Sequence, residues 1–302
     1  MTAPSRRLLS GLLAAALMGC QVQPEGAEAG TTPGSVRSTR AAALQELAVV
    51  QSWSIQLTNY TAGLKEVGAS KAGLVVVEPE GDGERWTPAE VAAAAQGRLL
   101  FGYLSVGQAE NYRSYWQSGW RPGTPAWLQT EDPDWPGDYR VAYWDPAWQA
   151  IMLRQLDALQ DQGFEGVFLD LVDAYELFPQ RATARQDMAR WVCTLAEHAR
   201  RRNPGFLLMT QNAMDIIEEP GYAACVDATN QEETYYYATD VPVDQQRYRD
   251  LMHWDPVWRA LGKPTFTLEY ATQPAHVERA YAQARADRLI PYVTVRALDR
   301  LP

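Results

Sequence analysis

Phe164-Glu-Gly-Val-Phe-Leu-Asp-Leu-Val-Asp-Ala-Tyr-Glu176 is the stretch of this 302-residue chain that says most about its fold. The short apolar run from Val167 to Leu169 is typical of a strand buried on both faces of a parallel sheet. The run ends in Asp170, and Asp173 and Tyr175 follow. Barrel enzymes carry their reactive groups at this end of a strand. The same carboxylates are also common caps of turns and helices, so the stretch alone leaves both interpretations open.

Seven further short apolar runs alternate with helix-like segments along the chain. The segments between the runs carry helix signals, such as the capping box that begins at Thr87 and the Gly163 that follows Pro146 to Gln162. This rhythm predicts a single (β/α)₈ TIM barrel, with a doubly wound sheet as the alternative that strand counting leaves open. The predicted strands are Trp53–Tyr60, Gly73–Glu78, Leu99–Val106, Gly166–Asp170, Phe206–Gln211, Ala224–Asn230, Thr265–Glu269 and Pro291–Val295.

Longer helices are expected at Ala182–Arg202, Pro242–Leu261 and Pro274–Asp287. The printed sequence ends seven residues after Val295, so the last helix of the barrel is expected to be short or missing. Ala41–Val50 has a helical pattern. We expect this helix to cover the seam between the first and last strands, and the barrel domain to span residues 41–302.

The first 40 residues have the composition of a targeting segment and a tether. Arg6 and Arg7 precede an apolar stretch that ends at Leu17-Met18-Gly19-Cys20. Residues 1–19 resemble the signal peptide of a bacterial lipoprotein, which is cut before a lipid-bearing cysteine, here Cys20. Residues 20–40 are rich in small and polar residues and are expected to form a flexible tether. We therefore expect an extracytoplasmic protein, either a cell-surface lipoprotein or plainly secreted.

Composition and charge exclude several functional classes. A net charge of −10 without a basic stripe argues against nucleic acid as a partner. The sequence has no P-loop and no Gly-x-Gly-x-x-Gly motif, and its three histidines lack neighbours at metal-ligand spacing, so we expect no cofactor and no metal. A metal site built from carboxylates stays open. Cys193 on a predicted helix and Cys225 at the start of a predicted strand leave their pairing open as well.

Polar side chains follow nearly every predicted strand. In a parallel barrel these positions share one rim, so they predict a site built from several strands. Many carboxylates without metal ligands or a Ser/His pair indicate acid/base chemistry of the kind that glycoside hydrolysis uses. The 11 Trp and 15 Tyr of the chain could supply flat faces for sugar rings. The rim residues are Glu78, Tyr103, Ser105, Gln108, Glu110, Asp170, Asp173, Gln211, Asn212, Asp227, Glu232, Glu233, Glu269, Tyr270 and Arg296.

Four stretches are long and distinctive: Ser105-Val-Gly-Gln-Ala-Glu-Asn-Tyr-Arg-Ser-Tyr-Trp116, Trp135-Pro-Gly-Asp-Tyr-Arg-Val-Ala-Tyr-Trp-Asp-Pro-Ala-Trp148, Gly166-Val-Phe-Leu-Asp-Leu-Val-Asp-Ala-Tyr175 and Gln211-Asn-Ala213. Together they resemble glycoside hydrolase family 114, the endo-α-1,4-polygalactosaminidases and their bacterial and archaeal relatives, some once labelled cysteinyl-tRNA synthetase-like. The resemblance spans roughly Trp53 to Arg296. It implies a (β/α)₈ barrel and retaining hydrolysis of α-1,4-linked galactosamine polymers, an exopolysaccharide substrate.

The resemblance also implies roles for individual residues. The acid that ends the fourth strand falls on Asp170, expected as the nucleophile, and the acid after the sixth falls on Glu232, expected as the general acid/base. Glu233 is adjacent, and the correspondence could slip by one position. Residues expected to bind substrate or to support the site are Glu78, Tyr103, Glu110, Asp173, Tyr175, Asn212, Glu233, Glu269 and Tyr270.

The chain departs from the family at one position. Many relatives read Gly-Glu-Ala-Glu where this chain reads Gly107-Gln108-Ala109-Glu110. Loss of that carboxylate could weaken the attraction for an amino sugar. Two alternatives to the polygalactosaminidase therefore stay open, a barrel that binds glycan without cleaving it and a hydrolase of a different glycosidic linkage. Because Asp170 and Glu232 are both present, the sequence favours an enzyme.

Overall fold

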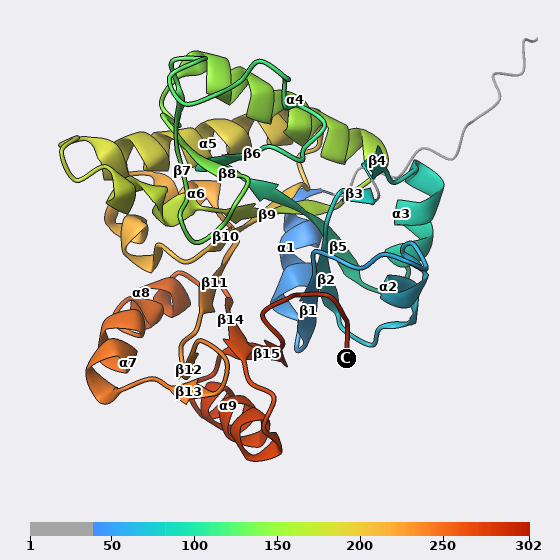
Figure 1. The fold of residues 1–302 in the computed structure, drawn as a ribbon. Helices are drawn as coiled ribbons and strands as arrows, with labels where there is room; N and C mark the ends of the chain where they lie inside the picture. Colours follow the sequence, from blue (N-terminus) through green and yellow to red (C-terminus); the bar gives the residue numbers. More distant parts are fainter. Residues whose placement is uncertain (1–38, 82) are drawn as a thin grey trace, which may run out of the picture. The chain divides into compact units, whose positions relative to one another are not determined.

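The computed structural model describes residues 39–81 and 83–302. The expected signal peptide, Cys20 and nearly all of the tether lie outside these residues. Eight parallel strands form one sheet that curls into a barrel, in the order β1-β2-β5-β9-β10-β11-β14-β15 (Figure 1). The predicted (β/α)₈ fold is confirmed. The strands are β1 (Trp53–Gln56), β2 (Leu74–Val77), β5 (Leu99–Ser105), β9 (Gly166–Asp170), β10 (Leu207–Gln211), β11 (Ala228–Glu232), β14 (Thr265–Tyr270) and β15 (Ile290–Thr294).

Helices lie around the strands (Figure 1). The expected capping box at Thr87 is present, and Gly163 ends its helix in the left-handed conformation. No helix of the described residues is long and apolar enough to cross a membrane. The helices are α1 (Arg40–Ala48), α2 (Lys65–Ala69), α3 (Pro88–Ala94), α4 (Pro146–Gln162), α5 (Ala184–Arg202), α6 (Tyr222–Cys225), α7 (Gln245–Leu251), α8 (Asp255–Ala260) and α9 (Pro274–Ala286), with 3₁₀ turns η1 (Val172–Leu177) and η2 (Met214–Glu218).

Two of the expected element boundaries are wrong. Cys225 ends the short helix α6 instead of starting a strand, and β11 begins only at Ala228. The single helix expected over Pro242–Leu261 is two helices, α7 and α8, because the chain turns between Met252 and Trp254. Cys225 forms a disulfide with Cys193 of α5, so α6 is covalently attached to α5.

We expected helix α1 to cover the seam between β1 and β15. The structure does not place it over the seam. Its buried residues Ala43 and Leu47 belong to the same core as the side chains inside the barrel. Arg40 binds the carboxylate of Asp227, which precedes β11, and so holds the start of α1 away from the seam, whereas Ala48 at the end of α1 lines the cavity at the seam. The helix therefore closes the amino-terminal end of the barrel interior. The seam keeps a cavity of about 840 Å³ between β1 and α9.

The carboxyl end of the seam is bridged by the residues after β15. The backbone N–H of Leu57, just after β1, donates a hydrogen bond of 2.8 Å to the carbonyl of Leu298. The hydroxyl of Thr58 donates to the carbonyl of Ala297, and the amide of Asn59 to the carbonyl of Asp299. No helix follows β15 among the described residues, in agreement with the expected short or missing last helix.

The barrel interior is filled with aromatic rings below a polar rim. Trp53 packs against Phe168, Phe266 and Tyr292 with ring centroids 5.6–6.3 Å apart. These buried rings form a solid core inside the barrel. Three short strands inserted between β5 and α4 form a separate antiparallel sheet, β6 (Gln108–Glu110), β7 (Leu128–Glu131) and β8 (Asp138–Val141). Two-stranded ribbons form from β3 (Glu80–Gly81) with β4 (Glu84–Arg85), and from β12 (Tyr236–Tyr237) with β13 (Val241–Pro242).

The position of α1 predicts unequal effects of its two central leucines. Leu47 is 2% exposed and Leu44 is 38% exposed. Leu47→Ala should therefore lower the free energy of unfolding by about 2–5 kcal/mol, because it leaves a cavity in the core. Leu44→Ala should cost less than about 1 kcal/mol. Urea denaturation measures both, and equal effects would contradict the packing of α1 into the barrel.

Candidate active site

A cleft lies at the carboxyl ends of the barrel strands. Its cavity has a volume of about 440 Å³. Residues at or just after the ends of all eight strands line it, as the common rim predicts. Asp227 lies at the opposite end of the barrel, paired with Arg40 and Arg200. The lining includes Glu78, Tyr103, Gln108, Glu110, Asp132, Trp135, Asp138, Asp170, Asp173, Gln211, Asn212, Glu232, Tyr270 and Arg296.

Asp170 ends β9 in the cleft and is held by two hydrogen-bond donors. The hydroxyl of Tyr103 donates to Oδ2 at 2.6 Å, and the backbone N–H of Leu171 donates to Oδ1 at 2.7 Å. Burial raises the pKa of Asp170, whereas these two hydrogen bonds lower it. The net effect is a pKa above the ordinary value of an aspartic acid, and the two donors, which favour the charged form, limit this rise.

Glu232 ends β11 and has a different environment. The hydroxyl of Tyr270 donates to its Oε1, and its own backbone N–H donates to Oδ1 of Asn212 at 3.0 Å. Burial raises the pKa of Glu232 to about 7. The hydrogen bond from Tyr270 opposes this rise, the nearby charges of Asp170 and Glu233 add to it, and Arg296 opposes it. Near neutral pH, both the protonated and the charged form of Glu232 are therefore populated, which suits a general acid/base.

Asp173 is a third carboxylate in the cleft. Its Oδ2 accepts a hydrogen bond of 3.3 Å from the amide of Asn212. Burial raises the pKa of Asp173 to about 7, and the charge of Asp170 adds to the rise. Asn212 therefore connects Asp173 to the backbone of Glu232 and links the ends of β9, β10 and β11.

The backbone turns sharply after each of these three strands. Leu171, Asn212, Ala213 and Glu233 all have φ between 51° and 58°, in the left-handed region that side chains other than glycine rarely adopt. Such conformations concentrate at functional sites, where the surrounding structure holds them. Here they follow directly after Asp170, Gln211 and Glu232.

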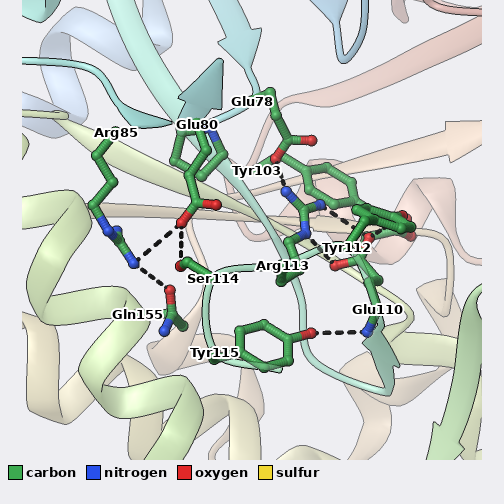
Figure 2. A network of polar contacts seen from close by, with 12 residues as sticks. Glu78, Glu80, Arg85, Tyr103, Glu110, Tyr112, Arg113, Ser114, Tyr115 and Gln155 are labelled. Carbon is green, nitrogen blue, oxygen red and sulfur yellow. Dashed lines mark hydrogen bonds and ion pairs between the residues drawn. The ribbon is translucent and has the colours of Figure 1, made fainter. Parts of the chain in front are cut away.

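Glu78 and Glu110 line the cleft but share one cation, Arg113 (Figure 2). The guanidinium binds Glu110 through two nitrogens, at 2.6 and 2.9 Å, and also binds Glu78. Burial raises the pKa of Glu78 to about 7, although Arg113 opposes the rise. The hydroxyl of Tyr112 donates to Glu110 at 2.8 Å. Arg113 thus offsets part of the negative charge on this side of the cleft, a role the sequence analysis missed.

The inserted sheet supplies a second group of cleft residues that the sequence analysis missed, Asp132, Trp135 and Asp138. The side-chain amide of Gln108 donates to Asp132 at 2.8 Å. Trp135 is 50% exposed, and the guanidinium of Arg296 lies 5.5 Å from its ring centre. Trp135 and Asp138 begin one of the family-like stretches, and that was the available signal. Their convergence with the barrel rim depends on the fold of the insertion.

Three expected site residues lie elsewhere. Tyr175 points to Asp215, to which its hydroxyl donates at 2.5 Å, and does not line the cleft. Glu233 lines a neighbouring cavity and lies 3.6 Å from Arg247. Glu269 is fully buried beside the backbone of the segment after β11 and does not reach the cleft. Within residues 39–81 and 83–302, no group of three or more His, Cys, Asp or Glu is arranged to hold a metal ion.

Comparison with known proteins identifies the family. Residues 34–301 match the profile of "Glycoside-hydrolase family GH114". The chain belongs to this family. It is a glycoside hydrolase. An uncharacterized protein of Deinococcus radiodurans is 51% identical over 97% of each chain, and one of Thermotoga maritima is 30% identical over 82% of this chain and 81% of that relative.

Two solved structures share the fold at low sequence identity. The glycoside hydrolase domain of PelA from Pseudomonas aeruginosa is 23% identical, with a TM-score of 0.64 over 83% of this chain and 97% of that domain. Ega3 from Aspergillus fumigatus, solved in complex with galactosamine, is also 23% identical, with a TM-score of 0.60 over 83% of this chain and 93% of that chain.

The environment of Glu232 predicts a pH-dependent cost to stability. The pKa of Glu232 rises from 4.5 to about 7 in the folded protein, so the folded state binds this proton more tightly than the unfolded chain. Stability is therefore lost as pH rises from about 4.5 to 7. Glu232→Gln cannot ionise and should be about 1–3 kcal/mol more stable than the wild type at pH 8, with no such gain at pH 4.5.

Urea denaturation at the two pH values measures this difference. Glu197→Gln, at an exposed position of α5, is the control and should lack the gain in stability at pH 8. A Glu232→Gln protein that is less stable than the wild type at pH 8 would contradict the raised pKa.

Proposed function

We propose that this protein hydrolyses α-1,4-linked galactosamine-type exopolysaccharide with retention of configuration. Asp170 acts as the nucleophile and Glu232 as the general acid/base. The observation that carries the proposal is the difference between the two carboxyl groups. Both oxygens of Asp170 accept a hydrogen bond, from Tyr103 and from the N–H of Leu171, and these donors oppose the rise of its pKa on burial, whereas Glu232 has its pKa raised to about 7. The galactosamine bound to Ega3, a protein of the same fold, supports the class of sugar.

In the first step a carboxylate oxygen of Asp170 attacks the anomeric carbon and forms an ester bond to the sugar. Glu232 gives its proton to the glycosidic oxygen, so the carbon–oxygen bond breaks and the leaving chain departs as an alcohol. In the second step Glu232, now a carboxylate, takes a proton from water, and the water oxygen attacks the anomeric carbon. The ester bond to Asp170 breaks, and both residues return to their starting states.

The neighbouring tyrosines orient these two groups. The hydrogen bond from Tyr103 and that from the Leu171 N–H hold both oxygens of Asp170, so its carboxylate plane is fixed toward the sugar. Tyr270 holds one oxygen of Glu232 and leaves the other for the proton transfer. A reacting group held in this way loses little further freedom when the substrate binds.

The charge of the cleft supports an amino sugar as substrate. Besides the two reacting acids, Asp132, Asp138 and Asp173 line the cleft, whereas Arg113 already pairs with Glu78 and Glu110. An ammonium group on the sugar would offset this negative charge. Gln108 replaces a glutamate of many relatives, but its amide holds the carboxylate of Asp132 in the same part of the cleft. A negative charge is thus retained there despite the replacement.

The proposal includes the cellular setting. The lipobox-like sequence before Cys20 and the tether that follows favour an enzyme displayed outside the cytoplasm, anchored by a lipid on Cys20 or released. A polysaccharide is too large to cross a membrane unaided, so an enzyme that degrades exopolysaccharide needs this location.

The proposed roles predict the loss of turnover in two isosteric variants. Asp170→Asn removes the attacking anion and Glu232→Gln removes the transferable proton. Each should lower the release of reducing ends from partly deacetylated polygalactosamine by at least about 10²–10⁴-fold. Polyglucosamine and a neutral α-glucan serve as comparison substrates, and Glu46→Gln is the matched surface control.

Each outcome of this assay has a defined meaning. Release from polygalactosamine alone supports both the linkage and the roles. Wild-type rates in either variant would remove that residue from the mechanism. Release from the glucan instead would point to a hydrolase of another linkage, and binding of glycan without release would point to a non-catalytic barrel.

A further inference from the structure

Glu269 is a buried carboxylate that the proposed mechanism does not use. It is 0% exposed and lies on β14 between Leu268 and Tyr270. Successive side chains of a strand point to opposite faces. Leu268 and Tyr270 line the cleft, so Glu269 points outward, between the barrel and the structure around it.

The carboxylate of Glu269 accepts four hydrogen bonds. Its Oε1 accepts the backbone N–H of Thr234 at 3.0 Å and the hydroxyl of Thr267 at 2.5 Å. Its Oε2 accepts the backbone N–H groups of Tyr235 and Tyr236, at 2.9 and 3.0 Å. Three consecutive N–H groups of the segment that follows Glu232 and Glu233 therefore converge on one side chain.

These hydrogen bonds are made by neutral donors, and no ion pair compensates the charge of Glu269 within the described residues. Burial raises the pKa of Glu269 to about 7, while the four hydrogen bonds lower it. A buried carboxylate is costly to stability unless its hydrogen bonds are all made. An apolar side chain would fill this position at a lower cost in stability. The function of Glu269 therefore lies in its four hydrogen bonds.

The segment that Glu269 holds begins immediately after the proposed acid/base. Glu233 has a φ of 53°, and its N–H donates to the carbonyl of Leu268 at 2.9 Å. Beyond it, Tyr235 and Tyr236 pack against α9 through Ala280 and Ala284. The direction of the chain at Glu232 is therefore determined by two attachments, to Leu268 and to Glu269.

We propose that Glu269 is a positioning residue, which holds residues 234–236 so that the carboxyl group of Glu232 stays in the desolvated part of the cleft. This proposal rests on the proposed role of Glu232. Glu269 acts from the outer face of β14 and does not touch the substrate. Its own protonation state matters only because an anion accepts all four hydrogen bonds.

Glutamine cannot replace Glu269 in this role. Its side chain has the same shape, but one oxygen becomes an NH₂ group, which donates only. With the NH₂ toward Tyr235 and Tyr236, two hydrogen bonds would be lost. With the NH₂ toward Thr234 and Thr267, the hydroxyl of Thr267 can accept instead, and the hydrogen bond from the N–H of Thr234 would be lost. Glu269→Gln should therefore release part of the segment without leaving a cavity, and Glu232 should become more hydrated.

The test is the titration of Glu232 in Glu269→Gln, followed through the carboxyl carbon by NMR and assigned with Glu232→Gln. The groups that bear on Glu232 are Asp170, Asp173, Glu233, Tyr270 and Arg296, and all of them are kept in the variant. We expect the midpoint to fall by about one pH unit or more toward the ordinary value, because hydration favours the carboxylate. The alkaline limb of the kcat profile should move in the same direction, with KM nearly unchanged.

Asp227→Asn is the matched control. Asp227 is also buried, at 2% exposure, and also accepts a backbone N–H, from Leu208 at 2.8 Å, but at the amino-terminal end of the barrel. This variant should lose stability without moving the midpoint of Glu232. If Glu269→Gln fails to fold, Thr267→Val removes one of the four donors and should shift the midpoint in the same direction by a smaller amount.

An unchanged midpoint in folded Glu269→Gln, or in Thr267→Val if the first variant does not fold, would overturn the proposal. So would an equal shift in Asp227→Asn. Because the titration needs no substrate, its result is separate from the proposed function. A shifted midpoint in a protein that cleaves none of the polymers would keep the positioning role and reject the acid/base role.

Discussion

The constraint on which the structure depends is the placement of two half-buried carboxyl groups in the cleft, at the ends of β9 and β11. Burial opposes the charge on both of them, and the barrel compensates with donors that differ between the two sites. Tyr103 and the Leu171 N–H favour an anion at Asp170. Glu232 has the hydrogen bond from Tyr270 but also the charges of two neighbouring acids. The proposed mechanism assigns opposite tasks to these two carboxyl groups.

Much of the surrounding architecture can be understood as support for these positions. The aromatic core around Trp53 fills the barrel beneath the cleft, and α1 closes the far end. Asn212 connects Asp173 with the backbone of Glu232, and Glu269 holds the segment that follows. Left-handed residues after three neighbouring strands indicate that the chain turns sharply to bring these groups together.

The sequence predicted the eight strands because short apolar runs are local patterns. It predicted the strand-end location of Asp170 and Glu232 because the carboxyl ends of parallel strands share one rim of the barrel. It could not separate Glu269 from Tyr270. Both faces of a barrel strand are buried, so polar and apolar residues do not alternate clearly along it, and the sequence does not show which side chains point outward. The sequence also did not show that Arg113 pairs with Glu78 and Glu110, since this pairing depends on how the chain folds after β6. Cys225 was misplaced because a single turn of helix resembles the start of a strand.

The stereochemistry of the first product tests the central claim most directly. If Asp170 attacks the anomeric carbon and water later displaces it, two inversions return the α configuration. Proton NMR of the reaction at early times, before the anomers interconvert, should therefore show the α-anomer of the new reducing end. Initial release of the β-anomer would mean that water attacks directly, and it would contradict the assignment of Asp170 as a nucleophile.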